Sequence, residues 1–258
     1  MSQLKNQKPK SIVPSVNKAI DIILLLSQSP DLSMKEIAET LELPSSTCFN
    51  ILTTLEYRGF IKKNDKSLGY SLGLSIMRLG LQVYENIDIR KIALPIMKEL
   101  TSIHNETCYL ATLAPSKLEG FIIERVESSK TLVVLLPVGD KVPLYATATG
   151  KSLLSGFSEE DLTFYLNNVE LSAFSTKTII TEEQLREELE QIRRKGYATT
   201  HNELGDGASA ISCPIKDYEG NIIAAISLSG PTQRMVTQFP AMIQDVQEAA
   251  NKISRSLQ

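Results

Sequence analysis

Apolar residues recur three or four positions apart near the start of the chain, a spacing that places side chains on one face of an α-helix. We predict a first helix from about residue 15, with Val16, Ala19, Ile20, Ile23 and Leu24 on one face. It should end near Ser29, because Pro30 disfavours helical backbone in the residue before it.

Two shorter helices follow, separated by a tight turn. Ser33 and Glu36 have the spacing of a capping box, in which each side chain bonds the other residue's backbone N–H at a helix start. Leu43-Pro44 should end that helix. A further helix, from near Ser45 to Gly59, places its apolar stripe at Cys48, Ile51, Leu52 and Leu55. Two short helices around a tight turn predict a helix-turn-helix.

The next segment reads as a strand, a turn and a second strand. Apolar and lysine residues over 60–63 precede the polar turn 64–66, and a β-prone stretch follows over 68–72. A hairpin after a helix-turn-helix is the wing of a winged helix. We therefore predict a winged helix-turn-helix domain over residues 13–73, preceded by a mobile basic tail over residues 1–12.

Residues 74–91 are predicted to link this domain to a second one over residues 92–258, with a helix over 74–86. Strands and helices then mix, which predicts an α+β domain with a mostly antiparallel sheet and helices packed on it. Thr181 and Gln184 suit a helix start, and Gly196 suits its end. The predicted strands cover 108–113, 121–126, 131–136, 210–215 and 221–229, and the helices 92–104, 149–154, 159–166, 182–195 and 240–257.

Composition narrows the class of protein. No apolar run reaches the ~18 residues that a membrane-spanning helix needs, and the N-terminus lacks the apolar core of a signal peptide. The three cysteines, Cys48, Cys108 and Cys213, have no paired spacing, which favours reduced thiols. We therefore expect a cytoplasmic protein without a membrane partner.

Charge is distributed unevenly along the chain. The net charge is −3, which by itself disfavours nucleic-acid binding. Residues 1–73, however, hold nine Lys or Arg and seven Asp or Glu, a net of +2, and the remaining residues carry a net of −5. DNA binding needs local rather than overall positive charge, so the predicted winged helix is compatible with it.

Three motifs suggest other chemistry. Ser71 lies in a G-x-S-x-G match, and with His201 it would have the chain order of an esterase; a predicted strand position for Ser71 makes chance the better account. The glycines over 205–207 resemble a dinucleotide fingerprint, but a predicted strand follows where a helix is required. Cys108, His201 and Cys213 lack metal-ligand spacing. We expect no enzyme activity, no cofactor and no metal.

Several blocks along the chain resemble the isocitrate lyase regulator (IclR) family of bacterial transcription factors. They occur in the family's order, which makes the resemblance specific. It implies a GAF-like effector domain, homodimers or homotetramers, binding to double-stranded operator DNA, and a small effector such as an organic acid or a product of sugar-acid breakdown. The blocks cover residues 16–22, 43–47, 52–60, 70–73, 146–151 and 223–231, with Arg234.

The resemblance places base-reading residues at the start of the second helix of the motif. Such residues meet base edges in the major groove, and wing lysines contact phosphates. Many relatives carry Lys or Arg at positions 45 and 50, yet residues 45–57 contain no basic residue, which favours weaker or A·T-tuned binding. A sensor with degenerate DNA binding therefore remains an alternative. The expected DNA contacts are Ser33, Ser45, Ser46, Thr47, Asn50, Lys62 and Lys63.

The resemblance also implies an effector site in the second domain. Ser227 and Ser229 are two apart on a predicted strand, so both hydroxyls face one side, where they could hold a ligand or bond neighbouring backbone. Relatives differ at the positions of Thr200 and Ala210, so the identity of the ligand does not transfer. The expected effector contacts are Ala148, Thr149, Thr200, Ala210, Ser227 and Ser229.

Overall fold

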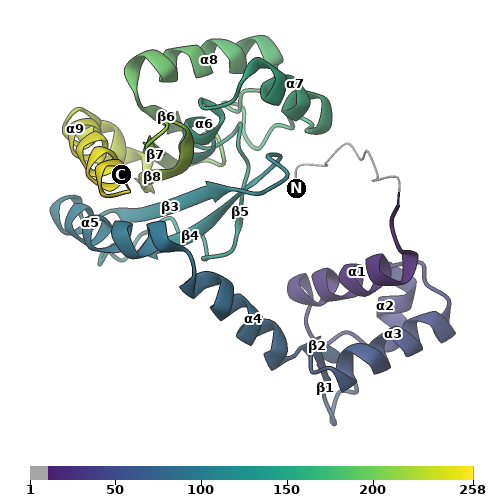
Figure 1. Cartoon of the computed structure of the whole chain (residues 1–258). Helices are drawn as coiled ribbons and strands as arrows, with labels where there is room; N and C mark the ends of the chain where they lie inside the picture. Colours follow the sequence, from purple (N-terminus) through teal and green to yellow (C-terminus); the bar gives the residue numbers. More distant parts are fainter. Residues whose placement is uncertain (1–10, 258) are drawn as a thin grey trace. The chain divides into compact units, whose positions relative to one another are not determined.

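The computed structural model describes residues 11–257, and Figure 1 shows its elements. The chain divides between Ile87 and Asp88 into two compact units. The tail predicted over residues 1–12 lies, up to residue 10, outside the described residues. Within the part of the chain that is described, no helix is long and apolar enough to cross a membrane.

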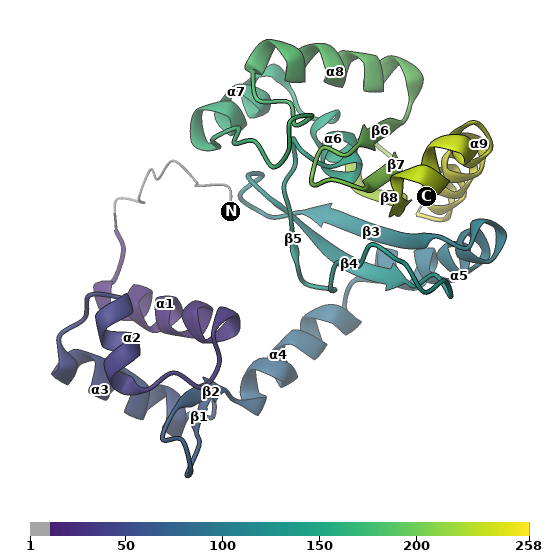
Figure 2. The ribbon, with the colours of Figure 1, turned by 180° about the vertical axis from the view of Figure 1, so that it is seen from behind.

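The N-terminal unit is a three-helix bundle with a two-stranded hairpin, followed by a fourth helix (Figure 2). Strands β1 and β2 pair antiparallel, with Ile61 opposite Leu72. Its core joins Ile22 and Leu26 of the first helix to Cys48 and Leu52 of the third. The elements are α1 (Pro14–Gln28), α2 (Met34–Thr40), α3 (Ser45–Tyr57), β1 (Ile61–Lys63), β2 (Tyr70–Leu72) and α4 (Leu74–Glu85).

Local interactions set the start of α2 and the end of α3. Ser33 and Glu36 form the predicted capping box at the start of α2. Gly59 follows α3 with φ +70°, a left-handed conformation that glycine adopts without strain. Gly73 packs against the Gly59 carbonyl so closely that a Cβ would collide with it. These contacts confirm the predicted helix-turn-helix and wing.

The apolar face predicted for the first helix turns out to be largely solvent-exposed. Ile22 and Leu26 are buried, whereas Val16, Ile20 and Leu24 are each about half exposed, at 55%, 49% and 53%. Helix α4 has no buried residue at all. The N-terminal unit thus displays apolar surface that its own core does not use.

The C-terminal unit is built on an antiparallel sheet of order β5-β4-β3-β8-β7-β6. This arrangement confirms the predicted α+β class. The strands are β3 (Thr107–Leu113), β4 (Gly120–Val126), β5 (Lys141–Val142), β6 (Ala198–His201), β7 (Ala208–Lys216) and β8 (Ile222–Pro231). The helices are α5 (Asp88–His104), α6 (Ala148–Leu154), α7 (Glu159–Asn168), α8 (Glu182–Lys195) and α9 (Thr232–Ser256).

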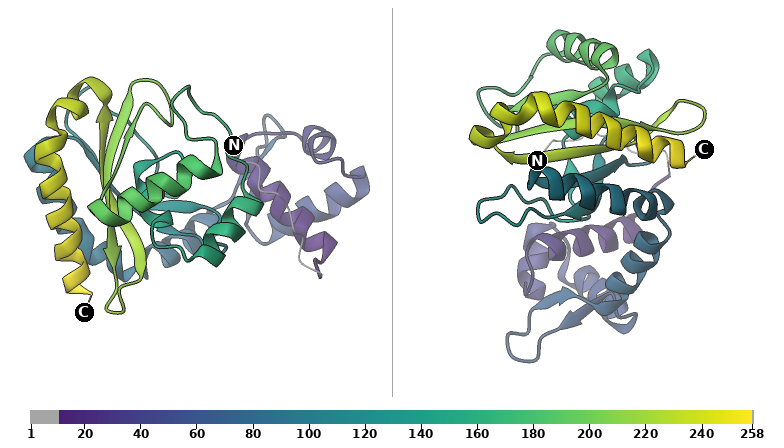
Figure 3. Two further views of the ribbon diagram at one scale, coloured as in Figure 1. Left: turned by 90° about the horizontal axis from the view of Figure 1, so that it is seen from above. Right: turned by 90° about the vertical axis from the view of Figure 1, so that its left-hand side faces the viewer.

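The helices form layers on both faces of the sheet (Figure 3). Helices α5 and α9 lie side by side over one face, and α6 packs on the other, with α7 and α8 further from the sheet. Strand β8 presents side chains to both helix layers, because Ile226 and Leu228 alternate with Ser227 and Ser229 along it. The hydroxyl-bearing residues therefore face the layer that contains α6.

The strand predicted over residues 131–136 is wrong. These residues form no strand, because side chains bond their backbone in place of a neighbouring strand. The Tyr109 hydroxyl donates to the Val134 carbonyl and accepts from the Leu136 N–H, and Arg125 donates to the Leu136 carbonyl.

Two predicted helix starts are too late, and two short strands were not predicted. Helix α5 begins at Asp88 rather than residue 92, and α9 begins at Thr232 rather than at Pro240. Pro240 lies inside α9 and is exposed, while Met235 and Phe239 before it are buried. Tertiary packing of those two residues outweighs the helix-breaking tendency of the proline. Strands β5 and β6 are the unpredicted ones.

Candidate nucleic-acid interface and effector cavity

The N-terminal half of α3 presents polar side chains to solvent. Ser45, Ser46 and Asn50 are exposed and Thr47 is half-buried, while Cys48, Leu52 and Leu55 hold the opposite face of the helix in the core. Among the described residues, no hydrogen bond occupies the side chains of Ser45, Ser46, Thr47 or Asn50. Their donors and acceptors are therefore available to a partner outside the protein.

The backbone at the start of α3 is also without a side-chain cap. Pro44 occupies the N-cap position and makes no side-chain hydrogen bond. Helix α2 differs, because the Ser33 hydroxyl accepts from the Glu36 N–H at 3.3 Å and donates to the Glu36 carboxylate at 2.7 Å. The hydroxyl and the backbone N–H of Ser33 both donate to the Glu36 carboxylate and hold its pKa below the ordinary value. Ser33 is thus engaged in the capping box, and the serines of α3 are not.

The two wing lysines differ in their surroundings. Lys62 and Lys63 are both exposed on β1, and adjacent strand residues point to opposite faces. The Lys63 Nζ lies 5.5 Å from the centre of the Tyr70 ring, within reach of a cation–π contact. Lys62 has no such contact. Ser71 lies within β2, where its hydroxyl accepts from the Asp31 N–H at 3.2 Å, so it does not occupy a strand-to-helix elbow.

A small cavity of about 50 Å³ lies in the C-terminal unit between α6 and the sheet. All six effector residues predicted from the family resemblance line it, from α6, β6, β7 and β8. Nine further residues, not predicted as effector contacts, also line it. The full lining is Tyr109, Ile122, Val134, Leu136, Val142, Thr147, Ala148, Thr149, Thr200, Leu204, Ala208, Ser209, Ala210, Ser227 and Ser229.

Strand register brings the predicted residues together. Thr200 pairs with Ala210, and Ala210 pairs with Ser229, so the three form one row across β6, β7 and β8. The Thr149 hydroxyl donates to the Ser227 hydroxyl at 2.9 Å, a buried bond from α6 to the sheet. Ser229 donates to the Ser209 carbonyl at 3.4 Å, which is long for an O–H···O bond. The Ser229 hydroxyl is therefore the less committed of the two serines.

The start of α6 is closed by its own cap. The Thr147 hydroxyl accepts from the Gly150 N–H at 2.9 Å, so this N–H is already bonded and is not available to a ligand. Gly150 also packs directly on the backbone of Leu144, where a Cβ would collide. The glycine thus lets α6, whose residues Ala148 and Thr149 line the cavity, approach the chain segment before it.

A segment without regular secondary structure forms another wall of the cavity. Residues 127–138 run over the cavity and contribute Val134 and Leu136. Tyr109 both lines the cavity and bonds the backbone of this segment. Arg234 of α9 bonds it too, through the Leu132 carbonyl at 2.8 Å. The role of Tyr109 has no local sequence signal, because it depends on a contact with a residue 25 positions away.

No charged residue among those described lines the cavity, and the buried charged groups of the unit form pairs elsewhere. Glu106 is fully buried and bonds Arg234 at 2.7 and 2.9 Å and Lys130 at 2.8 Å. Burial opposes its ionisation, but hydrogen bonds and charge from Arg234 and Lys130 outweigh burial and lower its pKa. Lys151, 1% exposed, lies 2.7 Å from Glu203, whose pKa burial raises despite the opposing effect of the lysine. The cavity itself is neutral and rich in hydroxyls.

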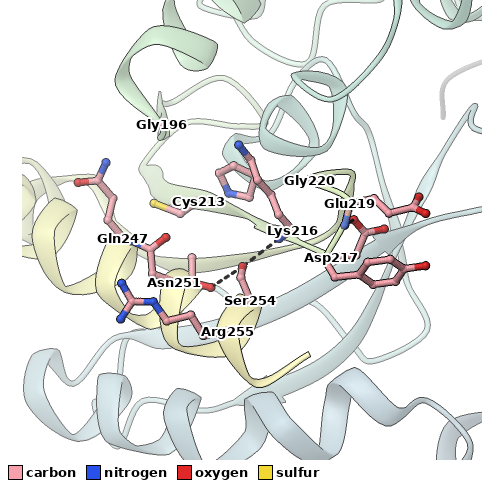
Figure 4. A pocket seen from close by; sticks show the side chains of 13 residues that line it. Gly196, Cys213, Lys216, Asp217, Glu219, Gly220, Gln247, Asn251, Ser254 and Arg255 are labelled. Carbon is pink, nitrogen blue, oxygen red and sulfur yellow. Dashed lines mark hydrogen bonds between the residues drawn. The ribbon is translucent and has the colours of Figure 1, made fainter. Parts of the chain in front are cut away.

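A larger hollow of about 710 Å³ lies elsewhere in the unit, between the β7–β8 hairpin and the C-terminal part of α9 (Figure 4). None of the predicted effector residues lines it. Lys216 and Arg255 face it together with Asp217 and Glu219, so it presents both signs of charge (Figure 4). A hydrogen bond from the Lys216 N–H to the Ser254 hydroxyl, 2.9 Å long, joins its two sides.

The cysteines are isolated. Cys48, Cys108 and Cys213 are free and buried, and burial raises the pKa of the Cys213 thiol to about 12. Within residues 11–257, no group of three or more His, Cys, Asp or Glu residues is arranged to hold a metal ion. His201 packs on the Phe239 ring, with the ring centres 5.0 Å apart.

A winged helix-turn-helix followed by an α+β domain with an internal cavity defines a class, the ligand-responsive transcriptional regulators. The chain belongs to the IclR family of that class. Residues 15–65 match the IclR helix-turn-helix domain, and residues 81–255 match the bacterial transcriptional regulator IclR C-terminal domain.

Known proteins support this assignment. The chain is 31% identical to the HTH-type transcriptional regulator KipR of Bacillus subtilis (strain 168), across 94% of this chain and 96% of KipR. It is similar to the crystal structure of IclR from Thermotoga maritima, with a TM-score of 0.74 and 31% identity over 95% of this chain and 98% of that one.

An IclR homologue from Microbacterium hydrocarbonoxydans, complexed with 4-hydroxybenzoate, shares the fold with a TM-score of 0.80 and 24% identity. The similarity extends over 94% of this chain and 98% of that homologue. The curated relatives are transcriptional regulators, and regulators of this class are not enzymes. The chain is therefore a transcriptional regulator with DNA-binding and effector domains, and the esterase alternative is excluded.

Proposed function

We propose that this regulator reads operator DNA with the first turns of α3 lying in the major groove. The observation that carries this proposal is the exposed set Ser45, Ser46 and Asn50, whose side chains have no internal hydrogen-bond partner. Asn50 can pair bidentately with adenine, and serine hydroxyls can bond bases or phosphates. The expectation of A·T preference follows, because α3 carries no Arg or Lys to pair bidentately with guanine.

Phosphate contacts come from outside the α3 side chains. The uncapped N–H groups at the start of α3 favour a phosphate oxygen. Lys62 and Lys63 on the wing are both exposed and supply positive charge, and the Lys63 ammonium lies over the Tyr70 ring. Few cationic contacts imply a shallow dependence of affinity on salt. We expect Ser33 to contribute less than the α3 serines, because its hydroxyl is bonded within the capping box.

We infer that the protein works as a homodimer joined through its N-terminal units. Val16, Ile20 and Leu24 form an exposed apolar stripe on α1, and α4 exposes a second one at Leu74, Met77 and Leu81. Apolar stripes of this size on a small unit favour burial against another protein surface. A second copy fits because paired winged helices then meet half-sites about one DNA turn, ~34 Å, or multiples apart. A tetramer would need a further interface.

We propose that the cavity holds a small organic-acid-like or sugar-acid-derived effector. Its hydroxyls offer hydrogen bonds without a fixed charge: among the described residues Thr200 has no side-chain hydrogen bond, and the one bond of the Ser229 hydroxyl is 3.4 Å long. An engineered cavity of roughly 150 Å³ holds benzene, so a cavity of about 50 Å³ suits a ligand smaller than a six-membered ring. A ligand as large as 4-hydroxybenzoate, which the Microbacterium hydrocarbonoxydans protein binds, would require residues 127–138 to move outward.

Effector binding would act by shifting populations. A ligand that fits the cavity better in one arrangement of the dimer favours that arrangement, and α4 is the segment that leads from the DNA-binding unit toward the effector domain. The ligand then changes the affinity for the operator by the same factor as the operator changes the affinity for the ligand.

The test of DNA reading uses the full-length protein and a random duplex library. Selection should yield one A·T-containing palindromic site, and Asn50→Ala should lower affinity for it at least tenfold, the scale of one bidentate pair. Far-UV circular dichroism checks the fold of the variant. Binding without sequence preference would reject the reading of bases by α3 and leave a sensor with degenerate DNA binding.

A further inference from the structure

One large apolar side chain stands among the polar residues of α3. Phe49 is 56% exposed, although it immediately precedes Asn50 in the first half of the helix. It does not belong to the core of the N-terminal unit, which takes Cys48, Leu52 and Leu55 from this helix. Stability therefore does not account for an aromatic ring at this position.

The helical positions place Phe49 on the surface that would face the groove. It lies three residues after Ser46 and four before Thr53, so the three share one face of α3. Asn50 is the next position around the helix. All of these neighbours are neutral and exposed. An aromatic ring at the centre of such a surface would contact the floor of the major groove, not the phosphates that border it.

The major groove presents one apolar group, the C5-methyl of thymine. A phenyl ring makes favourable contact with this methyl and gains nothing comparable from cytosine, which has a hydrogen at C5. Resting on the proposed binding of α3 to DNA, we infer that Phe49 reads a thymine methyl group beside the adenine contacted by Asn50. The pair would divide the recognition of neighbouring A·T pairs between an apolar contact and an amide contact.

The experiment measures the methyl contact directly. Operator duplexes selected by the wild-type protein are remade with single thymines replaced by deoxyuridine, which removes only the C5-methyl group. At one position in each half-site, we expect the replacement to weaken wild-type binding about fourfold, the effect of one methyl group losing its apolar contact. The Phe49→Ala protein should bind the thymine and uracil duplexes equally. Phe49→Leu, which keeps an apolar side chain, should retain part of the discrimination.

A matched control lies on the same helix. Tyr57 is 88% exposed at the C-terminal end of α3, so Tyr57→Ala removes an aromatic ring of similar size away from the base-reading turns. It should discriminate thymine from uracil like the wild type. Uracil sensitivity that persists in Phe49→Ala, or its absence at every thymine with the wild type, would overturn the inference while leaving DNA reading intact. Absence of a selected operator would overturn the proposed function as well.

Discussion

Replacing Glu106 by glutamine should destabilise the C-terminal unit by about 2–4 kcal/mol. The carboxylate is fully buried and accepts three charge-assisted hydrogen bonds, two from Arg234 and one from Lys130. Each such bond contributes about 1.5–3 kcal/mol. The side chains of Arg234 and Lys130 remain 27% and 30% exposed and can rehydrate, so the sum is reduced and stays near the low end for a broken buried pair.

Urea unfolding followed by far-UV circular dichroism measures this loss. The transition of the C-terminal unit should move to lower urea by roughly 1 M with an unchanged slope. Glu99→Gln is the control, because Glu99 lies 3.9 Å from Lys252 and both side chains are about half exposed. An exposed pair of this kind contributes less than ~1 kcal/mol. Equal losses in the two variants, or a loss below about 1 kcal/mol in Glu106→Gln, would refute the reasoning.

The pH dependence gives an independent check of the same group. The pKa of Glu106 is lowered in the folded protein from its ordinary value of 4.5. Its contribution is therefore complete above about pH 4.5 and is lost as the pH falls through the lower folded pKa. The stability difference between wild type and Glu106→Gln should be constant from pH 7 to pH 5 and should shrink below pH 4.5. A difference that grows on acidification would contradict the assignment.

Further predictions concern the DNA-binding and effector units. Lys62→Ala should lower the slope of log affinity against log salt by about 0.9 per protomer if the lysine contacts one phosphate, measured by fluorescence anisotropy; an unchanged slope excludes that contact. Gly150→Ala should lower the melting temperature of the C-terminal unit, because its Cβ would collide with the Leu144 backbone, and unchanged melting would show that α6 can move away. Met77→Lys should weaken dimers in sedimentation velocity experiments, since Met77 is 60% exposed on α4 and contributes nothing to the core; undisturbed dimers would place the interface elsewhere.

The N-terminal unit was the more predictable part of the fold. Its signals are local: a capping box at Ser33, a glycine at position 59 with positive φ, and an apolar stripe on α3. The segment over residues 131–136 shows the opposite case. Its apolar, β-branched sequence favours a strand, yet Tyr109 and Arg125 bond its backbone from distant positions. Such contacts have no local signature.

The residues of the candidate sites also differ in how far the sequence predicts them. The six predicted cavity residues come from the family resemblance, and strand register places them around one space. Thr147 and Ser209 were not predicted: Thr147 is the N-cap of α6, and Ser209 lies in β7 between β6 and β8. Phe49 could have been found from the sequence, since it is an aromatic residue outside the apolar stripe of its helix.

The most direct test of the account is the linkage between cavity and operator. Small carboxylic and sugar acids are screened for raising the melting temperature of the full-length protein, and operator affinity is then measured with and without the stabilising compound. We predict a change in operator affinity of at least fivefold in the wild type and none in Ala210→Val, whose added methyl groups fill a cavity of only about 50 Å³. An equal change in both proteins, or ligand binding with no effect on the operator, would contradict the account.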